Sequence, residues 1–268
     1  MPVMLVGSRA ARWALWALFA VLALPLFVLP SAVVLAASFA GRWSGVLPSA
    51  FTTAHYADLG SGESVDALVT SLVTAAVAGL VALLAGGWAA LAGRRLGRRA
   101  RRLLDGLFML PVAVPSVVVG LSLLVAFSRP PLLLNGTGTI VILAHTVLVS
   151  AFGYQSVSAA LVRLDPALEQ SAAGLGARPA RVLWRITLPL LLPAFSAALG
   201  LCFALSMGEL SATMMLYPPD WLPLPVRIFA TTDRGALFTG AALAVVLMAS
   251  TLVVLLGTAR LRTRAAYR

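Results

Sequence analysis

The stretch Glu169–Pro189, EQSAAGLGARPARVLWRITLP, decides how the rest of the chain is interpreted. It lies between two strongly apolar segments, yet it carries one glutamate and three arginines. Asp165 is a suitable N-cap, and Pro166 suits the first position of a helix. We expect a short amphipathic helix there, interrupted by glycine up to Gly176, and a second short helix that begins at Pro179. Such a helical elbow is too polar to lie in lipid and too regular to be a passive linker.

The composition is that of a polytopic membrane protein. Of the 268 residues, 60% are hydrophobic and only 11% are charged, whereas a soluble domain carries about 25% charged residues. Because a spanning helix needs about 20 apolar residues, we expect an all-α fold with about six transmembrane helices. The expected spans cover roughly residues 13–41, 67–93, 107–127, 139–162, 189–216 and 236–259.

These spans define the expected domain organisation. Residues 1–12 form an N-terminal segment, and residues 13–268 form a single transmembrane domain whose polar loop is 163–188. The third span contains Pro111, Pro115 and Gly120, which indicates a proline-kinked helix. Residues 42–66, 128–138 and 217–235 are expected to be loops on the opposite side from the elbow.

The arginines predict the orientation of the chain in the membrane. All 20 basic residues are arginines, and sixteen of them fall on the side that holds the elbow and both termini. Loops rich in Lys and Arg stay in the cytoplasm, so we expect both termini and the elbow to be cytoplasmic. The net charge of +11 is then interpreted as topogenic and lipid-facing, and we expect no nucleic-acid partner.

The sequence contains no recognisable catalytic or metal-binding pattern. The phosphate-binding pattern G-x-x-x-x-G-K-[ST] is absent, so any ATP chemistry would belong to a partner. The histidines, His55 and His145, lie far apart, and the single cysteine, Cys202, sits in an apolar run. A lone histidine within a span is a functional candidate, but we favour a hydrogen bond between helices for His145.

A second candidate site is expected near the far end of the fifth span. Glu209 lies there among small and polar residues: Gly208, Ser211 and Thr213. A carboxylate within a span is costly unless it faces a cavity or a partner. These residues therefore line or gate a translocation path, or Glu209 is a structural acid that caps the span or bonds a neighbouring helix. The residues alone leave both interpretations open.

The elbow resembles a loop of the permease subunits of binding-protein-dependent ABC importers of type I. Gly176 is followed, after nine residues, by Ile186, Leu188 and Pro189, as in that family. The Glu-Ala-Ala start of the motif is replaced by Gln170, Ser171 and Ala172, with an acid one residue earlier at Glu169. The resemblance implies that the elbow is a coupling helix that seats in a cleft of a cytoplasmic ATP-binding subunit. It also implies that this chain is not an enzyme and holds no cofactor, because ATP and magnesium belong to the partner.

A second resemblance concerns the solute. The stretch from Gly208 to Phe229, with its Gly-Glu-x-x-Ala-Thr core, looks like permeases for iron(III), thiamine, molybdate or sulfate, polyamines and phosphonates. Its longer form, residues 206–235, looks most like permeases for 2-aminoethylphosphonate.

The two resemblances together imply half of a translocation pathway in a bacterial inner membrane. An external substrate-binding protein and a second permease, identical or homologous, would complete the importer. Permeases for the other solutes remain alternatives, as do an ion-driven carrier, a membrane-embedded enzyme and a structural scaffold. The exact solute and the pairing of permeases stay open.

Overall fold

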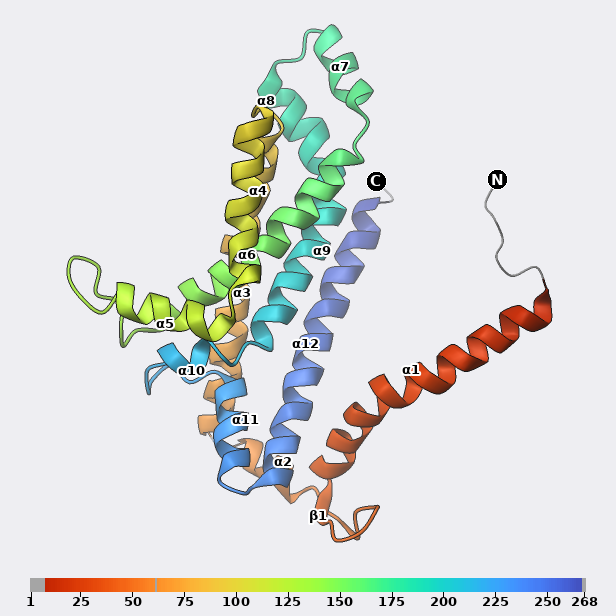
Figure 1. The fold of residues 1–268 in the computed structure, drawn as a ribbon, viewed down its shortest axis with the longest axis vertical. Helices are drawn as coiled ribbons and strands as arrows, with labels where there is room; N and C mark the ends of the chain where they lie inside the picture. The colour runs from red at the N-terminus through yellow and green to blue at the C-terminus, as the bar shows by residue number, and fades with distance from the viewer. Residues whose placement is uncertain (1–7, 61, 267–268) are drawn as a thin grey trace. The chain divides into compact units, whose positions relative to one another are not determined.

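The computed structural model describes residues 8–60 and 62–266, and it is predominantly helical (Figure 1). Of the described helices, five are long and apolar enough to cross a membrane, or up to six if one bent pair counts as a single span. The all-α, multi-span expectation is therefore confirmed. The chain divides into two compact units, one of residues 1–61 and 228–246 and the other of residues 62–227 and 247–268.

The first unit contains one long apolar helix and a small hairpin. Its elements are α1 (Arg9–Ser38), β1 (Ala40–Arg42), β2 (Ala50–Phe51), α2 (Ala54–Ala57), η1 (Asp58–Gly60), most of α11 (Leu224–Asp233) and the start of α12 (Leu237–Ala266). The two strands pair antiparallel. The Tyr56 hydroxyl donates to Ser38 Oγ (2.7 Å), and a His55 ring nitrogen lies 3.0 Å from the Ala40 carbonyl. The expected loop at 42–66 is thus tied by hydrogen bonds to the end of α1 and to β1.

The second unit holds the helical core. Its elements are α3 (Gly62–Gly93), α4 (Arg98–Ala113), α5 (Ser116–Ala126), α6 (Gly138–Val162), α7 (Pro166–Gly174), α8 (Pro179–Val182), η2 (Leu183–Thr187), α9 (Leu188–Met207), α10 (Thr213–Leu216), the first residues of α11 and the rest of α12. Helices α3, α6 and α9 pack against one another. The buried face of α3 is made almost entirely of Ala, Gly, Ser and Thr, and small residues let membrane helices approach closely.

Helices α3 and α6 approach each other closely in this core. A Cβ atom added at Gly86 would lie 2.6 Å from the backbone nitrogen of Tyr154. One added at Gly153 would lie 3.1 Å from the Ala82 carbonyl oxygen. Glycine is needed on both helices because backbone meets backbone at this point.

The third expected span is broken and not merely kinked. Helices α4 and α5 meet at an angle of 103° across Val114 and Pro115. Val114 is extended, with ψ at 132°, because a residue before proline is driven out of the helical region. The expected proline kink in the span over 107–127 is therefore a break between two helices, which together can still count as one span.

The fifth expected span is shorter than predicted. Helix α9 ends at Met207, and residues 208–212 leave the helix before α10 begins. Glu209 therefore lies in a helix break and not inside a spanning helix, which corrects the expected span of 189–216. The break is tolerated because side chains bind its freed backbone groups, as the site geometry shows.

Candidate functional site

The elbow, residues 163–188, begins with α7. Asp165 caps this helix, since its Oδ1 accepts a hydrogen bond from Ala167 N at 2.9 Å. Pro166 occupies the first turn, where its missing N–H costs nothing. The expected start of the elbow is confirmed. Within the described residues α7 buries none of its own side chains.

The end of α7 is built around Gly176. This residue has φ at +82°, a left-handed conformation that side-chain-bearing residues rarely adopt. Gly176 N donates to the Ala173 carbonyl (2.9 Å), and Ala177 N donates to the Ala172 carbonyl (3.0 Å). This pair of bonds is a Schellman motif, which satisfies the last carbonyls of the helix. The glycine is required by the backbone, because nothing lies within 4 Å of an added Cβ atom.

The second half of the elbow runs without interruption into the fifth span. Helix α8 begins at Pro179, as expected, and η2 is a π-helix that leads into α9. A π-helical segment changes the direction in which side chains project and often marks a functional region. Within η2, Thr187 is buried and only 2% exposed.

Glu169 joins three elements of the elbow region. Its Oε1 and Oε2 accept hydrogen bonds from the two terminal nitrogens of Arg94, each at 2.9 Å. Oε1 also accepts from the Thr187 hydroxyl at 2.7 Å. We call these three residues the Glu169 clamp. The hydrogen bonds from Arg94 hold the pKa of the Glu169 carboxyl below its ordinary value, so the group is ionised at neutral pH.

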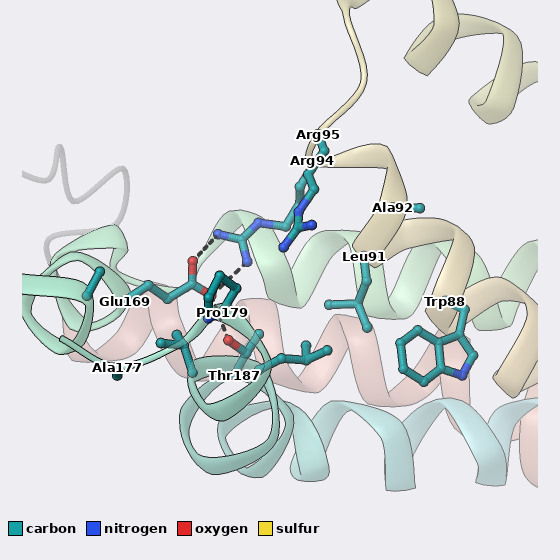
Figure 2. A pocket seen from close by; sticks show the side chains of 12 residues that line it. Trp88, Leu91, Ala92, Arg94, Arg95, Glu169, Ala177, Pro179 and Thr187 are labelled. Atoms are coloured by element: carbon teal, nitrogen blue, oxygen red, sulfur yellow. Dashed lines mark hydrogen bonds and ion pairs between the residues drawn. The ribbon is translucent and has the colours of Figure 1, made fainter.

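The three residues of the Glu169 clamp line one side of a cavity. This cavity has a volume of about 740 Å³ and lies between the end of α3 and the elbow. Trp88 and Leu91 line it from α3, and Ala177 and Pro179 line it from the elbow (Figure 2). In Figure 2 a guanidinium from the end of α3 reaches the Glu169 carboxylate. The Glu169 clamp thus connects the elbow to the end of α3 beside this cavity.

The other predicted loop residues fall into two groups. Gln170, Ser171 and Pro189 are exposed, whereas Ala172, Ile186 and Leu188 are half-buried. Leu168 of α7 is 47% exposed, and Leu175 at its C-cap is 90% exposed. The elbow therefore presents an apolar surface that this chain does not cover.

The second predicted site is the break after α9. The Glu209 carboxylate accepts hydrogen bonds from Ala212 N (3.1 and 3.2 Å), Thr213 N (3.3 Å) and the Thr213 hydroxyl (3.2 Å). Glu209 thereby caps the start of α10, and it stays half-buried while Gly208 and Ser211 are exposed. The two ion pairs of the described residues do not include it.

His145 holds this break in place. One ring nitrogen lies 2.6 Å from Ser206 Oγ and the other 2.8 Å from Thr213 Oγ1. With the ring proton on Nε2, His145 donates to Thr213, Thr213 donates to Glu209, and Ser206 donates to Nδ1. The expected hydrogen bond between helices is confirmed, because His145 of α6 joins α9 to α10.

Sequence reasoning missed the polar face of α3. Three hydroxyls on this face hold the segment that follows α10. Trp221 Nε1 donates to Thr74 (3.0 Å), Leu224 N donates to Ser71 (2.7 Å), and Arg227 donates to Ser64 (3.2 Å) and pairs with Glu63 (2.9 Å). The spacing of positions 64, 71 and 74 places them on one helix face, and this pattern was the available signal.

Comparison with known proteins places this fold in a transporter family. The chain belongs to the family described as "Binding-protein-dependent transport system inner membrane component", whose profile matches residues 82–266. It is therefore a multi-pass membrane permease of an ABC importer and belongs to a transporter family.

The chain is also similar to individual named relatives and to solved structures. The chain is 48% identical, over 97% of its length and 98% of the relative, to the 2-aminoethylphosphonate transport system permease protein PhnV of Salmonella typhimurium, whose name marks that role as provisional. It is 35% identical, over 73% of its length and 78% of the relative, to the molybdenum transport system permease protein ModB of Mycobacterium tuberculosis. It also shares its fold with a chain of a bacterial alginate ABC transporter in complex with a periplasmic protein (TM-score 0.75, 20% identity, 95% and 96% coverage).

Proposed function

We propose that this permease carries 2-aminoethylphosphonate or a similar phosphonate across a bacterial inner membrane. The observation that carries the proposal is the 48% identity to the Salmonella permease, which extends over nearly the full length of both chains. Because the match spans whole chains, it includes the segment after α9 that resembles phosphonate permeases most.

The elbow is proposed as the surface that receives a cytoplasmic ATP-binding subunit. The exposure of Leu168 and Leu175 supports this role, since a protein partner would cover their apolar side chains. The proposed coupling loop is the predicted one, and it comprises Glu169, Gln170, Ser171, Ala172, Gly176, Ile186, Leu188 and Pro189. ATP and magnesium would be bound by that partner and not by this chain.

A second permease and an external substrate-binding protein would complete the importer. The structural neighbour crystallised with a periplasmic protein supports this general assembly. The two permeases would rock between inward-open and outward-open states. ATP and the loaded binding protein would drive the change only through their different affinities for the two states.

Uptake measurements test the proposed solute. Cells that lack this permease should lose accumulation of radiolabelled 2-aminoethylphosphonate, and a plasmid copy should restore it. Molybdate is the second candidate, because of the 35% identity to ModB. Unchanged phosphonate uptake with lost molybdate uptake would overturn the proposed solute and favour the second.

Glu209 and its neighbours Gly208, Ser211 and Thr213 are proposed to line the translocation path. The half-buried carboxylate supports this, because it lies in a helix break and has no cationic partner among the described residues. Glu209→Gln should keep the permease assembled but lower uptake several-fold. Normal uptake at full expression would show that the carboxylate is only a cap for α10.

A further inference from the structure

We propose that Glu169 acts inside this chain as a positioning residue, tying the elbow to α3 so that movement of the elbow moves the helical core. This inference rests on the proposed coupling role of the elbow. It differs from a role in which Glu169 directly binds the partner ATPase.

The structure of the elbow leaves room for such a tie to matter. Helix α7 buries no residue, and its main packing contacts are with α8 and η2, the next segments of the elbow. Between the elbow and the end of α3 lies the cavity of about 740 Å³. Without a polar bridge, α7 could tilt into or away from this hollow while α3 stayed in place.

The geometry of the carboxylate favours an internal role. Both of its oxygens face the fork of Arg94 at 2.9 Å, and Oε1 is shared with the Thr187 hydroxyl at 2.7 Å. A bidentate Arg–carboxylate pair fixes orientation as well as distance. The side chains of Glu169 and Arg94 are only 25% and 32% exposed. The acid is therefore turned toward its own chain.

At its other end, the Glu169 clamp is attached to α3, a helix that is packed into the core. Arg94 directly follows α3, and α3 packs against α6 and α9. At Gly86 its backbone touches that of α6. A displacement of α7 that is passed to Arg94 therefore reaches the packed core. Thr187 adds a second link, because it lies in the π-helix that leads into α9.

The first test measures the position of the elbow without any partner. Spin labels are placed at Leu175 on the elbow and Leu84 on α3, both exposed, with Cys202 replaced by Ala. We expect one narrow distance distribution for the parent and for the control Arg98→Gln, which removes an exposed arginine of the same basic stretch. Glu169→Gln and Arg94→Gln should each broaden the distribution. Unchanged distributions in both variants would overturn the proposal.

The second test measures coupling in cells that contain the native partners. Glu169→Gln and Arg94→Gln should each lower phosphonate uptake by about fivefold or more, without lowering the amount of ATPase subunit that co-purifies. The double variant should be no worse than either single variant. Exchanging the charges, with Arg94→Glu and Glu169→Arg together, should restore part of the uptake.

The outcomes separate this inference from the proposed function. Loss of the ATPase subunit in Glu169→Gln but not in Arg94→Gln would overturn the inference and place the acid at the partner interface. Absence of any ATPase subunit from the purified parent would overturn the coupling role itself. In that case, only the spin-label distance measurement would test whether the Glu169 clamp positions the elbow.

Discussion

Gly176 shows at the residue scale how one position shapes the elbow through its backbone. Its φ of +82° lets α7 close with two hydrogen bonds before the chain turns toward α8. This left-handed conformation costs a residue with a side chain about 1–2 kcal/mol. The cost is lower for asparagine, which adopts this conformation more readily. The glycine was recognisable from the sequence, and the structure supplies the physical reason for it.

Substitution of Gly176 should therefore act through strain and not through a clash. We expect Gly176→Leu to reduce the ATPase subunit that co-purifies with the permease, and Gly176→Asn to reduce it much less. Gly174→Leu is the matched control, because Gly174 lacks a positive φ and has equally open surroundings. Equal losses in Gly176→Leu and Gly174→Leu would show that side-chain bulk, and not backbone conformation, is what matters.

At the scale of elements, α3 determines how closely the core can pack. Its buried face consists almost entirely of small residues, and its hydroxyls hold the segment after α10. Helices α4 and α5, like α9 and α10, are instead separated by breaks. Gly120 of α5 approaches the backbone of Ala212 in the second break, where an added Cβ atom would lie 2.9 Å from its Cα. Helix α5 is thus packed against the second break.

The close contact of α3 with α6 predicts opposite effects for two glycine substitutions. Gly86→Ala must push the Tyr154 backbone away, and overpacking of this kind lowers the free energy of unfolding by about 1–3 kcal/mol. An alanine side chain at Gly106 on α4 meets nothing within 4 Å. Gly106→Ala should raise the free energy of unfolding by about 0.5–1 kcal/mol, because alanine favours a helix over glycine. Thermal unfolding of both variants in detergent, monitored by size-exclusion chromatography, measures the shift of each unfolding midpoint from that of the parent. A midpoint for Gly86→Ala at or above that of the parent would contradict the packing described here.

At the scale of the whole molecule, the chain exposes far more apolar surface than a soluble protein could. The most apolar stretch of α1 has none of its residues buried, and only 17% of the corresponding stretch of α12 is buried. Lipid and partner subunits are the surroundings that such surfaces require. The arginine distribution predicts an orientation for the chain, with the arginine-rich elbow on the cytoplasmic side of the membrane.

Labelling of intact cells tests that orientation. In a Cys202→Ala background, Leu47→Cys should react with a membrane-impermeant maleimide, because residues 42–66 are expected to face outward. Leu175→Cys should react only after the cells are opened. Both side chains are well exposed, at 77% and 90%, so burial does not explain a difference. The reverse pattern would place the elbow outside and exclude its proposed coupling role.

The sequence by itself determined the membrane class, the approximate spans, the expected orientation and the two short helices of the elbow. These features depend on neighbouring residues, because hydropathy, capping and turn chemistry act over a few positions. Only the tertiary structure decided where the third and fifth spans break, and that His145 joins Ser206 to Thr213. It also decided that Glu169 pairs with Arg94, 75 positions away. Such pairings depend on how distant segments pack together, and no local pattern in the sequence indicates which distant residues will meet.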